Sequence, residues 1–363
     1  MCEAAGEVSG EAKQQAVWAK ILPDHGFEYK GLKPSCAKGT PFSFYAHKGR
    51  MNKVVVFFEG GGACWDSSNC IGHPTYTSQV EEKREEFSNG IFNLQNPLNP
   101  FRDWSFVVIP YCTGDLHIGA NDVAYVYQGK TYTIRHRGFV NFRAVLYWMT
   151  ENLKGPSKIL VAGSSAGSYA ALFNFAYLQR AYPGAECALL SDAGNGVVTE
   201  KFIRRALINW RLLENLPDWI PGVDQAFSNE FAFPQLFTDI VKYFPHKDMG
   251  QYTTAHDSVQ IYFYNLMLCI DAGVYDPEVW KRIDSSVAAD WNSKMLEYVR
   301  YVADHSSNFG YYIGAGSDHT IMGLNKFFVE DSPGVPFEKW LNGILQGEKP
   351  ERLNADLSSA KRN

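Results

Sequence analysis

Residues 163–167, with the sequence Gly-Ser-Ser-Ala-Gly, constrain the fold of this chain most because of what lies on either side of them. The run 158–162 before them is short, apolar and partly β-branched, which predicts a buried strand. The apolar-rich stretch 166–181 after them predicts a helix. A G-x-S-x-G between a strand and a helix is typical of a nucleophile elbow, the sharp turn that exposes a serine at the carboxyl edge of a sheet. Ser165 is therefore the candidate nucleophile, and an ordinary β-to-α turn of small residues is the alternative.

Strand-like and helix-like runs alternate along the rest of the chain, which indicates an α/β fold. The predicted strands are apolar throughout, which is typical of a parallel sheet covered by helices on both faces. We expect strands at 53–58, 105–110, 158–162, 187–191 and 310–313, and helices at about 138–153, 166–181, 199–213, 257–271, 279–303 and 335–345.

The 363 residues contain no internal repeat and no low-complexity linker after the amino terminus. We expect one α/β domain over 17–350, a disordered tail at 1–16 and a second tail at 351–363. Residues 215–256 are rich in Pro, Phe and Trp and show little periodicity, which predicts a cap or lid over the sheet.

Composition excludes several classes of partner. The formal net charge is −5, and lysines and arginines are scattered, which argues against a nucleic-acid partner. No apolar run is long enough to span a bilayer. A monomer is favoured, and no metal site or cofactor is expected.

The seven cysteines lack the spacing of a zinc site, so disulfides and an oxidising location are expected. The protein is then secreted, periplasmic or at the cell surface. Cys64 and Cys70 are the best pair, because five intervening residues can form a tight bridged loop. One cysteine must stay unpaired, and Cys2 is the natural candidate. The pairing of the others is left open: Cys36, Cys112, Cys187 and Cys269.

The first residues are small and polar and contain no signal peptide. Cys2 is a candidate for the lipidated first residue of a lipoprotein, with a native disordered terminus as the favoured alternative. The sequence has no N-x-S/T sequon, which favours a bacterial origin.

A nucleophilic serine needs a histidine to take its proton and an acid to orient that histidine. His319 lies in a glycine-rich loop, 314–320, directly after the last predicted strand. It is the candidate base, and the alternative is a histidine on a surface loop. His256 and His305 are rivals.

Three aspartates compete for the role of the acid. Asp318 adjoins His319, and an immediate neighbour rarely has the geometry to orient the ring. Asp192 and Asp257 are nearly even on spacing. Asp257 stands at the start of a predicted helix and could equally be a helix cap.

The third requirement is a pocket for the oxyanion of the transition state. The glycine run at 60–62 follows a predicted strand, and glycines let backbone amides converge on one point. The second donor should be the amide of Ala166. A phosphate-binding loop is the alternative, but no Gly-Lys-Ser/Thr follows.

Four motifs occur together in this chain: Glu-Gly-Gly-Gly-Ala-Cys-Trp at 59–65, Pro-Tyr-Cys-Thr-Gly-Asp at 110–115, the elbow at 163–167, and Asp-Ala-Gly at 192–194. In this combination and order the chain resembles the pectin acetylesterase family, which also includes the Notum carboxylesterases. The resemblance covers about residues 30–325. It implies an α/β-hydrolase-like or flavodoxin-like fold and serine esterase activity without a cofactor.

The family nucleophile falls on Ser165, its acid on Asp257 and its histidine on His319. The resemblance therefore favours Asp257 over Asp192, although His256 stands where the family usually has phenylalanine. The resemblance also implies that the amides of Gly61, Gly62 and Ala166 form the oxyanion hole. It further implies that Cys64 and Cys70 form the family's small disulfide loop.

The sequence thus predicts an ester hydrolase that removes short acyl groups, acetyl above all, from a polysaccharide such as pectin or from a small ester. Two alternatives remain open. One is a lipase-type deacylase acting on longer or protein-linked acyl groups, and the other is a non-catalytic carbohydrate-binding relative.

Overall fold

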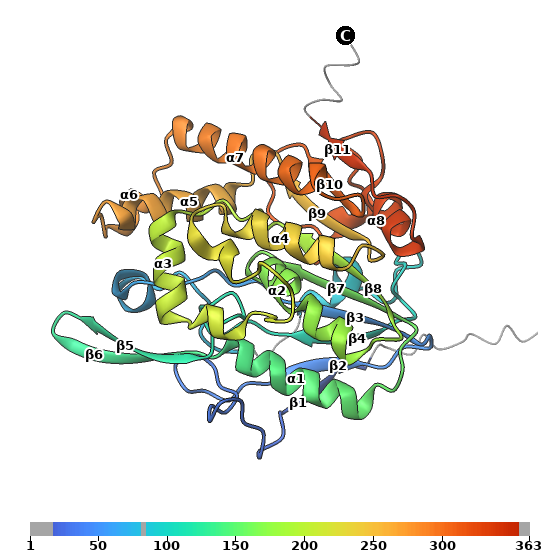
Figure 1. Cartoon of the computed structure of the whole chain (residues 1–363), viewed down its shortest axis with the longest axis horizontal. Coiled ribbons are helices and arrows are strands. Elements are labelled where there is room, and N and C mark those ends of the chain that lie inside the picture. Colours follow the sequence, from blue (N-terminus) through green and yellow to red (C-terminus); the bar gives the residue numbers. More distant parts are fainter. Residues whose placement is uncertain (1–16, 81–84, 356–363) are drawn as a thin grey trace, which may run out of the picture.

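The structure, a computed structural model, describes residues 17–80 and 85–355 (Figure 1). Its centre is a sheet with the strand order β1-β2-β4-β3-β7-β8-β9-β10-β11. The strands of this sheet are β1 (Ala19–Ile21), β2 (Phe44–His47), β3 (Lys53–Phe58), β4 (Ser105–Ile109), β7 (Lys158–Ser164), β8 (Glu186–Asp192), β9 (Met249–Thr254), β10 (Phe309–Gly314) and β11 (Arg352–Asn354). The expected tail at 1–16, with Cys2, lies outside the described residues.

The sheet is mostly parallel, as predicted. β2 is antiparallel to β1 and β4, and every neighbouring pair from β4 to β11 is parallel. The chain passes from β3 to β4 on one side and later adds β7 on the other side of β3. This reversal of strand order is a topological switch point, and its crevice lies at the carboxyl ends of β3 and β7. The glycine run and the elbow follow these two strands.

Helices cover both faces of the sheet, which confirms a three-layer α/β-hydrolase-like fold (Figure 1). Alternate residues of β3 point to opposite faces: Val54 and Val56 join the core on one face, and Val55 joins the core on the other. The second face is covered by α8 (Phe337–Gln346). The core on the first face contains side chains of α1 (Gly138–Asn152), α2 (Ala166–Ala181), α3 (Glu200–Asn209), α4 (Ala232–Tyr243), α5 (Ser258–Asp271), α6 (Pro277–Trp280) and α7 (Ser285–Asp304). Of these, α2 and α7 pack directly against strands of the central sheet.

The predicted elements lie where the sequence places them, except that two predicted helices are divided. The predicted helix at 199–213 ends at Asn209 as α3, and a short 3-10 helix follows at Leu212–Asn215. The predicted helix at 279–303 consists of α6 and α7. Pro277 occupies the first turn of α6, and Asp284 caps α7 by accepting a hydrogen bond from the amide of Ser286. Because an N-cap residue has a non-helical backbone, Asp284 starts a new helix and α6 and α7 are separate.

The structure corrects two boundaries. The segment expected as a cap, 215–256, contains α4, which packs against α7, but its last part is β9, an internal strand between β8 and β10. The sequence of β9, Met-Gly-Gln-Tyr-Thr-Thr, is polar, so apolar patterning missed a strand that is buried throughout. The tail expected at 351–363 likewise begins with β11, which pairs with β10. A lid function for the remainder of the cap segment stays a prediction.

A hairpin of β5 (Asn121–Tyr127) and β6 (Lys130–His136) projects from the body of the molecule and was not predicted (Figure 1). Its two-residue turn, Gln128 and Gly129, has positive φ at both positions, the geometry that matches the twist of paired strands.

Two disulfides are formed among residues 17–80 and 85–355. Cys64–Cys70 is confirmed, and Cys36–Cys112 is a pairing that the sequence left open. Cys187 and Cys269 are free thiols. Among the described helices, none combines the length and the apolar character needed to cross a membrane.

Candidate active site

The strand, turn and helix around Ser165 are formed as the elbow motif predicts. β7 ends at Ser164 and α2 begins at Ala166. Ser165 between them has φ +58°, which residues other than glycine rarely adopt. A Cβ at Gly167 would lie 1.9 Å from the carbonyl oxygen of Phe58, so only glycine lets α2 start against the end of β3. The serine is therefore held at the carboxyl edge of the sheet.

The glycine loop after β3 lies directly against this elbow. A Cβ at Gly60 would be 2.7 Å from both the Ser164 carbonyl oxygen and the Ser165 Cβ. The start of the loop is fixed by His117, whose Nε2 donates to the carbonyl of Glu59 at 2.9 Å. Burial lowers the pKa of His117 to about 4, so this imidazole is neutral near pH 7.

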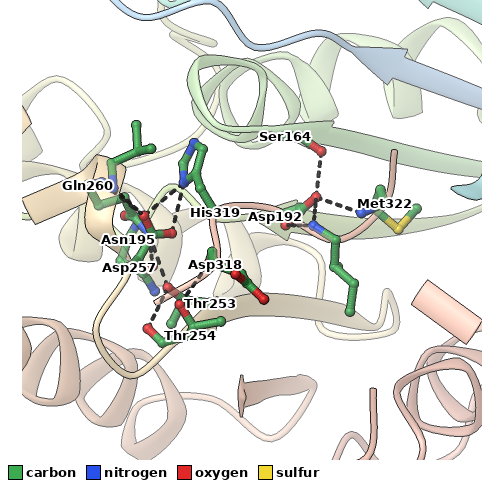
Figure 2. Close-up of polar contacts among 12 residues, drawn as sticks. Ser164, Asp192, Asn195, Thr253, Thr254, Asp257, Gln260, Asp318, His319 and Met322 are labelled. Carbon is green, nitrogen blue, oxygen red and sulfur yellow. Dashed lines mark hydrogen bonds and ion pairs between the residues drawn. The ribbon is translucent and has the colours of Figure 1, made fainter. Parts of the chain in front are cut away.

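Asp257 contacts the ring of His319. Its two carboxylate oxygens each lie 2.9 Å from His319 Nδ1 (Figure 2). Asp257 is also the N-cap of α5, where Oδ1 accepts the amides of Val259 and Gln260. The helix-cap interpretation and the acid interpretation are thus both compatible with the structure, because one carboxylate makes both sets of bonds.

The two loops that carry these residues are joined along their backbones. β9 and β10 are parallel neighbours, so their carboxyl ends reach the same edge of the sheet. Beyond them the amides of Ala255 and His256 donate to the carbonyls of Gly314 and Gly316. The loop pairing brings together residues that are 62 positions apart in the chain.

Ser165 and His319 line the same cavity, together with Gly62 and Ala166. The volume of this cavity is about 50 Å³. His319 Nε2 is buried and has no hydrogen-bond partner among the described residues. Gly61 belongs to the same loop but does not line the cavity. The other lining residues are mostly apolar: Ala63, Leu116, Tyr169, Ala193, Val197, Val198, Phe202, Val259, Gln260, Phe263, Met267 and Trp291.

Comparison with known proteins identifies the family. A family model described as Pectinacetylesterase matches residues 28–340, most of the chain. The chain belongs to the pectinacetylesterase family.

Relatives of this pectinacetylesterase-family chain match over shorter stretches. Palmitoleoyl-protein carboxylesterase NOTUM from Homo sapiens is 26% identical over 177 residues, which cover 44% of this chain and 34% of NOTUM. Pectin acetylesterase 11 from Arabidopsis thaliana is 29% identical over 168 residues, which cover 44% of this chain and 42% of the relative. The match thus spans less than half of each curated relative. These relatives come from an animal and a plant and give no support to the expected bacterial origin.

A solved structure shares the architecture. The Wnt deacylase Notum from Drosophila superimposes with a TM-score of 0.65, covers 92% of this chain and 94% of its own, and is 17% identical in sequence. At this level of identity the likeness concerns the fold alone.

The rival acids make other contacts. Asp192 is fully buried, but its carboxylate accepts from Ser164, Ile321 and Met322 and makes no hydrogen bond to the His319 ring. Asp318 is exposed and pairs with Lys326.

The rival histidines lie elsewhere. His256 and His305 are both exposed, and neither lines the cavity. Cys64, Cys70 and His136 are close enough together to suggest a metal site, but the two sulfurs are joined in a disulfide.

Sequence reasoning missed two residues of this site. Gln260 bonds Asp257 Oδ2 through Nε2 at 3.0 Å and accepts the amide of Asn195 at 2.9 Å. Its position three residues after Asp257, on the same face of a helix, was the available signal. His117 precedes Ser165 in the chain and so breaks the expected order of triad residues, which excludes it as the base but says nothing of its contact with the glycine loop.

Proposed function

We propose that this chain is a serine carboxylic ester hydrolase that works through an acyl-enzyme. The observation that carries the proposal is the state of His319: Nδ1 is bonded to Asp257, while Nε2 is buried without a partner in the cavity that Ser165 lines. Because Nδ1 donates to a carboxylate, the neutral ring has its free lone pair on Nε2. That nitrogen is the one that can take a proton from Ser165.

In the first half of the reaction the oxygen of Ser165 attacks the ester carbonyl carbon, and its proton passes to His319 Nε2. Collapse of the tetrahedral intermediate breaks the bond to the alcohol, which leaves with that proton. In the second half, water attacks the acyl-serine, His319 takes the proton of the water, and the acid is released as Ser165 regains its proton. Asp257 orients the ring and stabilises its cation throughout.

The amides of Gly61, Gly62 and Ala166 are proposed to bind the developing oxyanion. The first turn of a helix has amides without intrahelical partners, and Ala166 is the first residue of α2. The packing of Gly60 against Ser165 brings the glycine loop to the same side of the elbow. Removal of one such donor typically raises the barrier by about 3–4 kcal/mol.

The size of the cavity favours a short acyl group. A cavity needs roughly 10–15 Å³ to hold one water molecule. A cavity of about 50 Å³ has room for a few groups of that size, such as an acetyl group beside Ser165. Its apolar walls suit the methyl end of the acyl group.

The natural substrate is proposed to be an acetylated polysaccharide such as pectin, as the names of the plant relatives suggest. The alternative is a deacylase for longer or protein-linked acyl groups, favoured by the names of the Notum relatives. The two disulfides favour a secreted, periplasmic or cell-surface location.

The test compares wild type with Ser165→Ala on p-nitrophenyl acetate. The variant should lose turnover by several orders of magnitude while its melting temperature is unchanged, and a fluorophosphonate should label the wild type alone. Unchanged turnover in the variant refutes the assignment of Ser165 as nucleophile. A wild type that shows neither turnover nor labelling refutes the proposal as a whole and favours a non-catalytic relative. A series of nitrophenyl esters from acetyl to palmitoyl, followed by acetylated pectin and xylan, then distinguishes an acetylesterase from a long-chain deacylase.

A further inference from the structure

Asp192 connects the elbow to the loop that carries His319. It is the last residue of β8, and its carboxylate is fully buried. The hydroxyl of Ser164 donates to Oδ2, the amide of Met322 donates to Oδ2 at 3.0 Å, and the amide of Ile321 lies 3.1 Å from both oxygens (Figure 2). The backbone carbonyl of Asp192 accepts the amide of Ser165 at 2.8 Å.

These partners flank the two reacting side chains. Ser164 immediately precedes the candidate nucleophile, and Ile321 lies two residues after His319. The two segments are far apart in the chain, since Ile321 is 129 positions from Asp192 and Ser164 is 28 positions from it. One carboxylate therefore fixes the elbow and the histidine loop relative to each other.

The backbone around this carboxylate is strained at three places. Ser165, Ala193 and Thr320 have φ values of +58°, +60° and +65°. Such conformations cost about 1–3 kcal/mol each and persist only where the surroundings over-determine them. Ser165 adjoins Ser164, Thr320 adjoins Ile321, and Ala193 adjoins Asp192 itself. The carboxylate thus lies at the centre of the interactions that hold the three turns.

The chemistry of the partners fits an ionised carboxylate. Burial raises the pKa of Asp192, but every hydrogen-bond partner of its carboxylate is a hydroxyl or an amide that can donate. Among the described residues no lysine or arginine forms an ion pair with it. A buried carboxylate without a cation is costly unless it is well hydrogen-bonded, and these donors satisfy that condition.

We propose that Asp192 is a positioning residue that keeps His319 aligned with Ser165 by bonding Ser164 on one side and the Ile321–Met322 turn on the other. The inference rests on the proposed esterase function. It assigns no contact between Asp192 and the substrate.

The experiment measures p-nitrophenyl acetate hydrolysis by Asp192→Asn and Ser164→Ala, with active sites counted by exhaustive fluorophosphonate labelling. Asparagine leaves one acceptor oxygen and replaces the other with an amide that cannot accept. We expect kcat per labelled site to fall about 100-fold in Asp192→Asn, the size of loss that misplacement by about 1 Å can cause. In Ser164→Ala, which removes one of the bonds, we expect about a tenfold fall. KM should stay within about twofold, because eight of the sixteen residues that line the cavity belong to helices α2, α3, α5 and α7, and Asp192 is not among the sixteen.

Counting active sites separates positioning from folding. A merely structural role would lower the melting temperature and the labelled fraction but leave turnover per labelled site unchanged. Asp239→Asn, which removes a half-buried carboxylate on α4 away from the cavity, is the control and should keep wild-type turnover. If Asp192→Asn does not fold, Ser164→Ala decides.

A folded Asp192→Asn or Ser164→Ala protein whose kcat per site is within twofold of wild type overturns the proposal. That result leaves the proposed function intact. Absence of Ser165-dependent activity in the wild type would instead refute the function itself.

Discussion

The two sides of the candidate site are held together by different kinds of bond. The glycine-loop side is covalently braced: Cys36–Cys112 joins the segments that flank β2 and β4, and Cys64–Cys70 closes a small ring just after the glycine loop. The histidine side is held by hydrogen bonds. The described cysteines that follow Ser165 in the chain, Cys187 and Cys269, are free thiols.

The difference matches what each side is proposed to do. An oxyanion hole works because its donors are in place before charge develops, so a rigid support is an advantage there. In the proposed reaction His319 accepts and returns a proton, and a carboxylate bonded to Nδ1 would stabilise the charged ring while leaving Nε2 free. We infer that this site combines an oxyanion hole stiffened by disulfides with a base that is held by hydrogen bonds.

The largest expected effect comes from the histidine side. Asp257→Asn should lower kcat by about 10⁴-fold, because an amide in place of the carboxylate favours the wrong tautomer of His319. The melting temperature should change little, since asparagine can still cap α5. Asp284→Asn, at the N-cap of α7, is the matched control and should keep full activity. A smaller loss in Asp257→Asn than in Asp192→Asn would move the acid to Asp192.

The braced side should respond to loss of its disulfides. Replacement of Cys36 and Cys112 by serine should reduce the free energy of unfolding by about 4–5 kcal/mol, and replacement of Cys64 and Cys70 by about 2 kcal/mol, because the first bond closes a much longer loop. Activity should follow the reverse order, since the small ring adjoins the glycine loop. Urea denaturation and esterase assays check both orders. Equal losses of activity would remove the distinction between the two bonds.

Crowding at the glycine loop should cost less than loss of the acid. Gly60→Ala places a Cβ 2.7 Å from Ser165 Cβ, so the loop must move, and kcat/KM should fall about 100-fold. Gly184→Ala is the matched control, because a Cβ there meets no atom within 4 Å. Wild-type kinetics in Gly60→Ala would show that the loop is not part of the catalytic site.

The smallest expected effect concerns acid stability. Burial lowers the pKa of His117 to about 4, so the unfolded chain takes up a proton at higher pH than the folded one. Stability from this residue is complete above about pH 6.5 and is lost as pH falls towards 4. His117→Gln should therefore lose less stability than wild type between pH 7 and pH 5, by about 2 kcal/mol.

The pH dependence of the stability that Asp115 contributes has the opposite sign, so it must cancel in this comparison. Burial raises its pKa to about 6, so its contribution to stability grows as pH falls from about 6 towards 4. Because Asp115 is present in both proteins, its effect cancels in the comparison of wild type with His117→Gln. Parallel pH curves for the two proteins would show that His117 is not held neutral.

Much of this molecule could be predicted because its signals are local. The elbow depends on a strand, five small residues and a helix that adjoin one another in the chain, and α2 begins and ends where the periodicity places it. Cys64–Cys70 also depends only on near neighbours. Polar β9 shows the limit of such reasoning, since it is buried by the strands and helices around it and not by its own apolar character.

By itself the sequence determined the type of fold, the serine of the elbow, the glycine loop and a histidine beyond the last long strand. The spacing left Asp192 and Asp257 even, and the family resemblance favoured Asp257. Tertiary structure decided which carboxylate contacts His319, because β9 lies beside β10 and their loops are hydrogen-bonded to each other. It also decided that Asp192 bonds the turn after His319. Strand order brings these residues together across 60 to 130 positions of chain, a distance over which local patterns carry no information about contact.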